Sequence, residues 1–176
     1  MAGIDETLEF KPVRIAVLVV SDTRTLETDT SGQTLVDRIS DAGHVVADRQ
    51  IVKDDKATVR RVVQGWIDDD QIDAVITSGG TGLTGRDITV EALTPLFEKI
   101  IDGFSVVFHK VSFDTIGLST LQSRAFAGVA NGTFIFCLPG STGAVKDGWD
   151  KILAYQLDSR HRPCNFVDIM PRLLEQ

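Results

Sequence analysis

Short apolar runs alternate with amphipathic segments along most of this chain. Arg14–Val20 (RIAVLVV) is a continuous apolar run rich in β-branched residues, which is typical of a strand covered on both faces in a parallel sheet. After Ser31 and Gly32, apolar residues recur at helical spacing, and Gly43 stands where a left-handed helix end is expected. The pattern predicts a first strand followed by a first helix.

The same alternation continues through the middle of the chain. Val45–Val52 predicts a second strand, after which apolar residues between Val59 and Ile67 follow the spacing of one helical face. Residues 73–77 predict a third strand, which leads into a glycine-rich loop.

The second half of the chain is less regular. Residues 89–100 are expected to be helical, with Pro95 marking a kink or a new first turn. A further helix is predicted at residues 103–113, whereas polar residues leave residues 118–130 ambiguous between helix and loop.

A last strand and a last helix complete the pattern. Thr133–Leu138 (TFIFCL) predicts a strand by its β-branched and aromatic content, and apolar residues from Val145 to Leu157 mark one side of a long helix. Strands that alternate with helices imply right-handed crossovers, so we expect an α/β fold in which helices cover both faces of a mainly parallel sheet.

The residues that follow each predicted strand bear most on function, because ligands of such sheets bind outside the carboxyl ends of the strands. The four segments concerned are Ser21-Asp22-Thr23, Lys53-Asp54-Asp55, the glycine loop up to Asp87, and Pro139-Gly140-Ser141. These loops are predicted to converge on one rim.

The glycine loop reads Ser78-Gly79-Gly80-Thr81-Gly82-Leu83-Thr84-Gly85-Arg86-Asp87. Glycines allow close backbone approach and positive φ, so successive N–H groups can converge on a phosphate. The spacing also matches a dinucleotide-binding fingerprint, but Arg86 and Asp87 follow where a helix should already have begun, and the lysine of a Walker A loop is missing. A phosphate cradle is the main interpretation, and a tight turn without a ligand is the alternative.

Two aspartates on the predicted rim suggest a metal. Asp54 and Asp87 each precede a predicted helix, so either one alone would be interpreted as a helix N-cap. Two carboxylates beside a phosphate loop also suit Mg²⁺, which prefers a few carboxylates together with substrate phosphate oxygens. The pair therefore favours a magnesium site.

Composition sets broad limits. The 176 residues fit one domain, and 18 basic against 25 acidic residues give a formal net charge of −7, which argues against a nucleic-acid surface. Residues 1–12 lack the apolar core of a signal peptide and no long apolar span follows, so we expect a soluble, cytoplasmic protein without a membrane partner. The cysteines and histidines lack zinc or disulfide spacing, so we expect reduced thiols.

Five segments resemble one family, in the same order along the chain. They are VLVVSDTR at 17–24, DTSG at 29–32, SGGTGLTGRDITVEAL at 78–93, LQSRAFAGVANGT at 121–133 and LPGS at 138–141. From residue 12 to residue 166 the chain resembles the molybdenum cofactor biosynthesis family that includes MogA and MoaB, and residues 157–166 resemble its B branch. The resemblance implies a three-layer α/β/α sandwich and a homotrimer that is often doubled to a hexamer.

The resemblance also implies an activity. Active members bind molybdopterin and transfer AMP from MgATP to its terminal phosphate, with release of pyrophosphate. Asp54 and Asp87 fall on the two catalytic aspartates of those enzymes, where they would hold Mg²⁺, while the roles of Ser112, Ser123 and Arg86 stay open. The expected substrate and phosphate contacts are Ser21, Asp22, Ser78, Gly79, Gly80, Thr81, Gly82, Ser123, Pro139, Gly140 and Ser141.

By the same resemblance, residues 1–12 form an N-terminal extension, residues 13–159 the molybdopterin-binding domain, and residues 160–176 a tail that packs on the domain or on a subunit interface. Two positions depart from the family's adenylyltransferases, which commonly carry Pro-Gly-Asn where this chain has Ser141 and a proline where it has Lys53. The alternative hypothesis is a molybdopterin-binding carrier of the same pathway, which would work with other pathway proteins and transfer no AMP.

Overall fold

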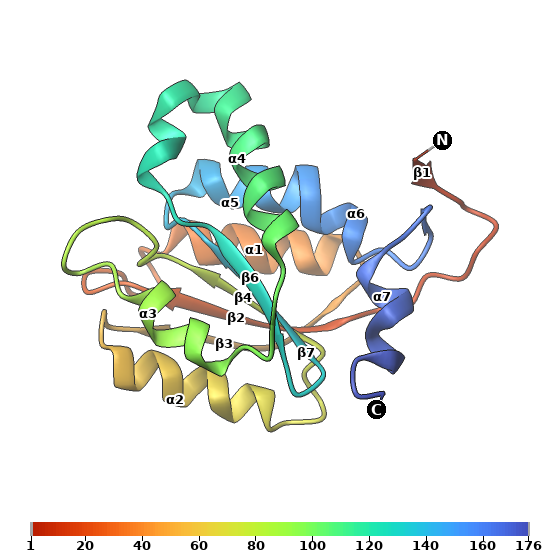
Figure 1. The fold of residues 1–176 in the computed structure, drawn as a ribbon, viewed down its shortest axis with the longest axis horizontal. Coiled ribbons are helices and arrows are strands. Elements are labelled where there is room, and N and C mark those ends of the chain that lie inside the picture. Colours follow the sequence, from red (N-terminus) through yellow and green to blue (C-terminus); the bar gives the residue numbers. More distant parts are fainter. Residues whose placement is uncertain (1, 176) are drawn as a thin grey trace.

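A six-stranded sheet with helices on both faces forms the body of the protein, and a two-stranded sheet lies beside it (Figure 1). The computed structural model describes residues 2–175. The strands are β1 Gly3–Ile4, β2 Arg14–Val20, β3 Val45–Val52, β4 Ala74–Ser78, β5 Lys99–Ile100, β6 Phe126–Ala130, β7 Thr133–Leu138 and β8 His161–Arg162. The helices are α1 Thr30–Asp41, α2 Lys56–Ile67, α3 Thr89–Leu93, α4 Asp102–Ile116, α5 Thr142–Gly148, α6 Ala154–Gln156 and α7 Phe166–Ile169, with shorter segments η1 Thr94–Leu96, η2 Gly117–Gln122, η3 Trp149–Leu153 and η4 Met170–Arg172.

The large sheet has the strand order β3-β2-β4-β7-β6-β5. Strands β3, β2, β4 and β7 are parallel. At one edge β6 pairs antiparallel with β7, and β5 pairs antiparallel with β6, so the predicted mainly parallel sheet is confirmed. The four parallel strands end at the same edge of the sheet. The chain passes from β2 to β3 on one side and then returns to β4 on the other side of β2, which creates a switch point between β2 and β4.

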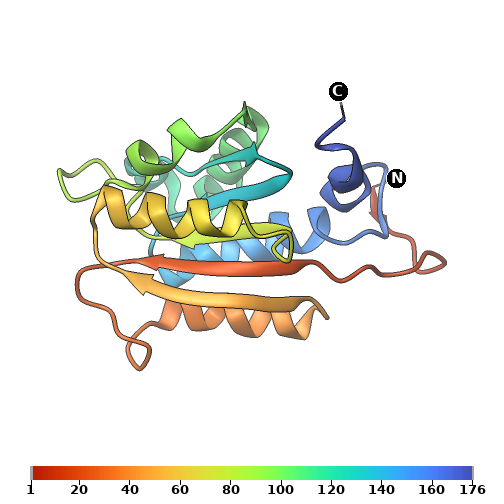
Figure 2. The same ribbon diagram turned by 90° about the horizontal axis from the view of Figure 1, so that it is seen from below.

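Side chains of β2 alternate between two hydrophobic cores. Ile15 and Val17 face the core that includes residues of α1, α4 and α5. Ala16 and Leu18 face the core built with α2 and α3. Figure 2 shows α1 (orange) and α2 (gold) on opposite sides of the sheet, which gives three layers. Because both faces of β2 are buried, its sequence after Arg14 is continuously apolar rather than alternating.

Helix boundaries follow local chemistry. Asp29 caps α1 by accepting a hydrogen bond of 2.8 Å from the Gly32 amide, and Asp55 caps α2 by accepting one of 2.8 Å from the Thr58 amide. The predicted last helix runs from α5 to α6 through η3, a π-helical segment. Within residues 2–175, no helix combines the length and the apolar character that crossing a membrane requires.

The antiparallel edge of the sheet differs from the prediction. The helix predicted at residues 89–100 ends at Leu93, passes into η1, and becomes strand β5, because Pro95 lies in the first turn of η1 and cannot continue the hydrogen bonding of α3. The ambiguous residues 118–130 are divided between η2 and strand β6. Position 128 in β6 requires glycine, because a Cβ there would lie 2.1 Å from the Phe97 ring.

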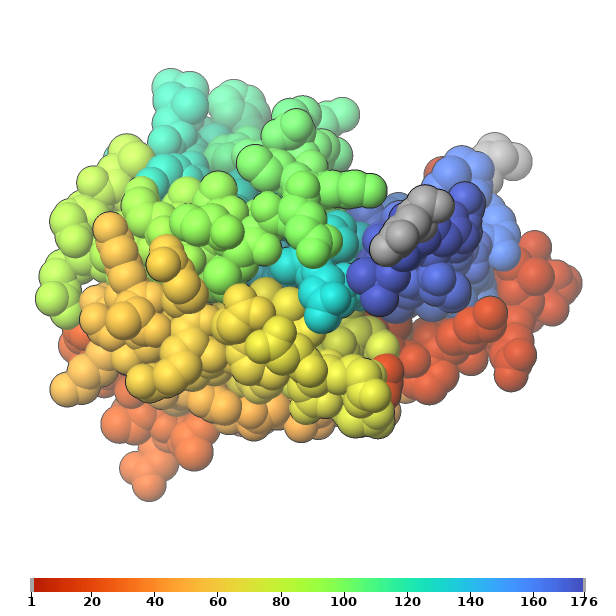
Figure 3. All heavy atoms as spheres, turned by 60° about the horizontal axis from the view of Figure 1, so that its bottom comes forward, coloured from red at the N-terminus to blue at the C-terminus, as the bar shows by residue number. Residues whose placement is uncertain are grey.

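The two ends of the described chain pack together. Strand β1 pairs with β8 in an antiparallel ladder, and Figure 3 shows the N-terminal segment (red) against the C-terminal segment (blue). The Phe166 ring of the tail packs 4.8 Å from the Phe134 ring of β7, measured between centroids. The tail thereby covers part of the core rather than extending from it.

Candidate functional site

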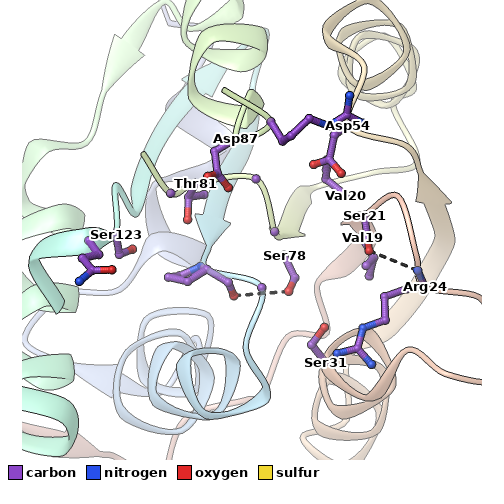
Figure 4. Close-up of a pocket in the computed structure, with 17 residues that line it drawn as sticks. Val19, Val20, Ser21, Arg24, Ser31, Asp54, Ser78, Thr81, Asp87 and Ser123 are labelled. Atoms are coloured by element: carbon purple, nitrogen blue, oxygen red, sulfur yellow. Dashed lines mark hydrogen bonds between the residues drawn. The ribbon is translucent and has the colours of Figure 1, made fainter. Parts of the chain in front are cut away.

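A pocket of about 400 Å³ opens at the carboxyl ends of the parallel strands (Figure 4). Its size falls in the range of small-molecule sites. It is lined by Val19, Val20, Ser21, Arg24, Ser31, Asp54, Ser78, Gly79, Gly80, Thr81, Gly82, Arg86, Asp87, Gln122, Ser123, Pro139 and Gly140. Residues after β2, β3, β4 and β7 therefore meet at one site, at the switch point of the sheet.

The glycine loop passes too close to its neighbours for side chains. Gly79 has φ of +105°, and a Cβ there would lie 2.2 Å from the carbonyl oxygen of Val20. Gly80 has φ of +67°, and a Cβ there would lie 2.3 Å from the hydroxyl of Thr89. Both positions require glycine, for conformation and for space.

Hydrogen bonds hold the carbonyl groups of this loop away from the pocket. The Thr89 hydroxyl donates to the Gly79 carbonyl at 2.8 Å, and the Thr89 amide donates to the Gly80 carbonyl at 2.9 Å. Arg124 donates through its amide to the Thr81 carbonyl and through Nε to the Gly82 carbonyl, both at 2.9 Å. Neither Thr89 nor Arg124 lines the pocket.

The amides of the loop remain available. Within residues 2–175, the N–H groups of Gly80 and Thr81 donate to no protein acceptor, although both residues line the pocket. Consecutive unpaired N–H groups with carbonyls fixed behind them form a concave site for an oxyanion. The loop is thus suited to a phosphate.

Asp87 is held as an ionised carboxylate at the end of this loop. Its Oδ2 accepts hydrogen bonds from the Thr84 amide at 2.9 Å and from the Thr84 hydroxyl at 2.7 Å. Burial alone would raise the pKa of Asp87, but the hydrogen bonds from Thr84 and the Gly82 amide outweigh burial and lower it. Asp87 therefore carries a negative charge at neutral pH.

Asp54 lies in a different environment on the same pocket. Burial raises the pKa of Asp54, and the negative charges of Asp22 and Asp87 raise it further. A backbone hydrogen bond from Asp22 and the positive charge of Arg86 lower this pKa, but burial and the neighbouring carboxylates outweigh them. A cation beside Asp54 would relieve both the burial cost and the repulsion between carboxylates.

Neither of these aspartates is a helix cap. Asp55, not Asp54, caps α2, and the N-cap position of α3 is occupied by Ile88, which forms no side-chain cap. The N-cap interpretation, which was open for both residues, is therefore wrong, and both carboxylates are left to the pocket.

Several predicted contact residues lie elsewhere. Asp22 lies outside the pocket lining, where it pairs with Arg86 and accepts a hydrogen bond of 3.2 Å from the Asp54 amide. Ser141 is also outside the lining, because its hydroxyl caps α5 by accepting from the Ala144 amide at 3.1 Å. Arg86 pairs with Asp22 rather than with its neighbour Asp87.

The structure places Ser112 and Ser123 differently with respect to the pocket. Ser112 is buried in α4 and does not line the pocket. Ser123 lines the pocket, and its hydroxyl is buried without a hydrogen-bond partner among the described residues. A buried hydroxyl without a hydrogen-bond partner destabilises the folded protein, and a ligand that hydrogen-bonds to it would remove this cost.

Sequence reasoning missed Arg24, Ser31 and Gln122, which line the pocket. Arg24 lies four residues after the end of β2, inside the segment VLVVSDTR, so its place in that motif was the available signal. Ser31 and Gln122 lie at a helix start and at the end of η2, where the hydrophobic pattern does not mark them, so their places in the segments DTSG and LQSRAFAGVANGT were the available signal.

No group of three or more His, Cys, Asp or Glu side chains in residues 2–175 could hold a metal ion by itself. A site of two carboxylates, as predicted for Mg²⁺, would draw its other ligands from substrate phosphates and water. Both thiols are free, and burial raises the pKa of Cys137 to about 12, so that thiol stays protonated.

The fold and the pocket define an α/β protein with a ligand site at the switch point of a parallel sheet, built from a glycine loop with unpaired amides and two carboxylates. A sequence profile described as "Probable molybdopterin binding domain" matches residues 16–159. Molybdenum cofactor biosynthesis protein B of Escherichia coli (strain K12) is 53% identical over 158 residues, which cover 90% of this chain and 93% of that protein.

Solved structures of similar proteins indicate the same family. A crystal structure of Molybdenum cofactor biosynthesis protein B matches with a TM-score of 0.84 at 39% identity, over 94% of this chain and 98% of that chain. The tungsten cofactor synthesizing protein MoaB from Pyrococcus furiosus matches with a TM-score of 0.73 at 37% identity, over 82% of this chain and 92% of that chain. This chain belongs to the molybdenum cofactor biosynthesis protein family and carries its molybdopterin-binding domain.

Proposed function

We propose that this chain is a molybdopterin adenylyltransferase, which transfers AMP from MgATP to the terminal phosphate of molybdopterin and releases pyrophosphate. One observation carries the proposal: the unpaired amides of Gly80 and Thr81 line the same pocket as the carboxylates of Asp54 and Asp87. Phosphate groups and a divalent cation are the ligands that such an arrangement suits.

The reaction joins two polyanions. An oxygen of the molybdopterin phosphate forms a bond to the α-phosphorus of ATP, while the bond from that phosphorus to the bridging oxygen of the β-phosphate breaks. Pyrophosphate leaves with the bonding electron pair, and no proton needs to move when the attacking phosphate is ionised. Positioning and charge neutralisation therefore supply most of the catalysis.

Asp54 and Asp87 would hold Mg²⁺, and this donor set fits that ion. Both groups offer carboxylate oxygens, and burial and the charges of Asp22 and Asp87 raise the pKa of Asp54 even though Arg86 lies nearby. When bound, the ion would offset the negative charge of the phosphates in the transition state. Thr84 keeps Asp87 ionised and oriented for that role.

The glycine loop would bind a phosphate through the Gly80 and Thr81 amides. The Ser123 hydroxyl would complete its hydrogen bonding with a polar group of the pterin or of its phosphate chain. Ser21, Ser78 and Pro139 line the remaining wall.

The proposal is tested by mixing the protein with molybdopterin, ATP and Mg²⁺ and detecting the AMP adduct and pyrophosphate by mass spectrometry. Asp54→Asn and Asp87→Asn should each abolish the adduct. Asp55→Asn is the matched control, because Asp55 caps α2 and asparagine caps helices equally well. No adduct from the wild-type protein, under conditions where an active transferase forms one, would refute the proposal.

A binding function without turnover is the second candidate. It is favoured by Ser141, whose hydroxyl caps α5, and by Lys53, since both positions depart from the pattern of the family's adenylyltransferases. This candidate expects tight molybdopterin binding without consumption of ATP. The same mixture separates the two, because binding and adduct formation are measured independently.

We also propose that the chain assembles as a trimer or as a dimer of trimers. Apolar side chains on α4 and η2 are exposed, among them Val106, Phe113, Leu118 and Leu121. Analytical ultracentrifugation tests this, and a monomer at micromolar concentration would contradict it.

A further inference from the structure

A second pocket of about 350 Å³ adjoins the main one. It lies at the loop between β2 and α1, and it shares Ser21 and Arg24 with the main pocket. Its lining consists of Ser21, Asp22, Arg24, Thr25, Leu26, Arg49, Ile51, Val52 and Lys53. The two pockets therefore have a wall in common, and Arg24 belongs to both.

The second pocket gathers positive charge on a chain whose net charge is −7. Three of its residues are cationic, and its one carboxylate, Asp22, is already paired with Arg86. The Arg24 guanidinium donates to the Thr28 carbonyl at 2.7 Å, and within residues 2–175 neither Arg24 nor Lys53 forms an ion pair. Uncompensated cations beside each other favour an anionic ligand.

Arg49 adds a fixed donor to this pocket. Its guanidinium donates to the buried Asp29 carboxylate at 2.9 Å and to the Gln33 side chain at 2.6 Å. Its Nε is buried and has no hydrogen-bond partner among the described residues. A buried charged donor without an acceptor carries a desolvation penalty, so a ligand acceptor that hydrogen-bonds to the Arg49 Nε would offset it.

We propose that this second pocket is a polyphosphate subsite, which holds the β- and γ-phosphates of ATP and then the pyrophosphate product. The proposal rests on the adenylyltransferase function above. Figure 4 shows the Arg24 side chain among the residues that line the main pocket, across from Asp87. A polyphosphate could therefore extend from the carboxylate pair past Arg24 toward Lys53 and Arg49.

This placement separates the two products of the reaction. Arg24, in the shared wall, would contact the phosphate next to the bond that breaks, and Lys53 would contact the far end of the leaving group. Charge-assisted hydrogen bonds to phosphate are strong, so removing one should weaken pyrophosphate binding by about 10- to 100-fold.

The test measures binding of inorganic pyrophosphate to the intact protein by isothermal titration calorimetry, with and without Mg²⁺. Arg24→Ala and Lys53→Ala should weaken this binding and raise the KM for ATP. Lys53→Ala should leave molybdopterin affinity unchanged, because Lys53 lies outside the main pocket. Arg61→Ala and Lys56→Ala are matched controls, because they remove the same charges from exposed positions outside both pockets. The controls should bind pyrophosphate within about twofold of the wild-type protein, as expected when long-range surface charge is screened by salt.

The outcomes separate this proposal from the one on which it rests. Equal weakening by the controls, no weakening by Arg24→Ala and Lys53→Ala, or no pyrophosphate binding at all would each overturn the subsite, even if the wild-type protein forms the AMP adduct. Weakening confined to Arg24→Ala and Lys53→Ala supports the subsite, even if adduct formation fails.

Discussion

Gly79→Ala tests how strictly the glycine loop depends on a bare backbone. The alanine Cβ would lie 2.2 Å from the Val20 carbonyl oxygen, more than 1 Å short of an ordinary contact, which begins at 3.4 Å. The neighbour is backbone of a central strand, so it cannot rotate away. Gly79 also has φ of +105°, which an L-residue rarely adopts.

The steric clash and the unfavourable φ together determine how far Gly79→Ala lowers the free energy of unfolding. The left-handed conformation costs roughly 1–2 kcal/mol for a residue with a Cβ, and forcing an atom into a packed site costs about 1–3 kcal/mol. We therefore expect Gly79→Ala to lower the free energy of unfolding by about 3 kcal/mol. For a domain of this size, that corresponds to a fall of about 6–12 °C in Tm.

Urea unfolding followed by circular dichroism, at one fixed protein concentration, measures the change. Gly85→Ala is the control in the same loop, because nothing lies within 4 Å of its Cβ position. Alanine there should be neutral or slightly stabilising. If Gly79→Ala unfolds within about 0.5 kcal/mol of the wild-type protein, as ordinary surface substitutions do, the argument from close approach is refuted.

Three further predictions follow from the environments of single side chains. Asp54→Asn should raise Tm at pH 7.5 while abolishing the adduct, because burial and the charge of Asp22 oppose ionisation of Asp54; a lower Tm would contradict this. Burial lowers the pKa of His44, whose Nδ1 accepts from the Val13 amide at 3.1 Å, so the unfolded chain binds the proton first and the free energy of unfolding should fall as pH drops below about 6.5. In urea unfolding at pH 7.5 and at pH 5.5, His44→Asn should lose less free energy of unfolding between the two pH values than the wild-type protein. An equal loss in both proteins would contradict this role of His44. Ser123→Ala should leave Tm unchanged or higher but weaken molybdopterin binding measured by calorimetry, because its buried hydroxyl has no partner in the protein; unchanged affinity would remove Ser123 from the site.

The inner parallel strands β2, β4 and β7 could be predicted from the sequence because both of their faces are buried. Strand β2 is therefore apolar after Arg14, β4 begins with an apolar Ala-Val-Ile run, and the helices between the strands show one apolar face. The antiparallel edge gave no such signal. Strand β6 contains alanine and glycine where bulky β-branched residues are usual, and Gly128 is small because Phe97, distant in sequence, packs against it.

The candidate site was predictable to the extent that parallel strands place their following loops together. That rule brought Asp54, Asp87 and the glycine loop to one pocket. It could not assign individual side chains, since their directions depend on contacts between segments far apart in sequence. Asp22 turns to Arg86, 64 residues away, and Ser141 turns back to cap its own helix.

Arg124 determines whether the glycine loop can be moved to another protein. Its amide and guanidinium bind the carbonyls of Thr81 and Gly82, and the guanidinium also reaches the Asp87 carbonyl at 3.3 Å and pairs with Glu91. The segment 78–87 grafted alone onto another α/β scaffold would lack these donors, and its carbonyls would be free to turn toward the ligand and repel it. A transferable unit must therefore include the segment between η2 and β6, which supplies Arg124 from outside the loop, so the phosphate-binding property is encoded by two separate stretches of sequence.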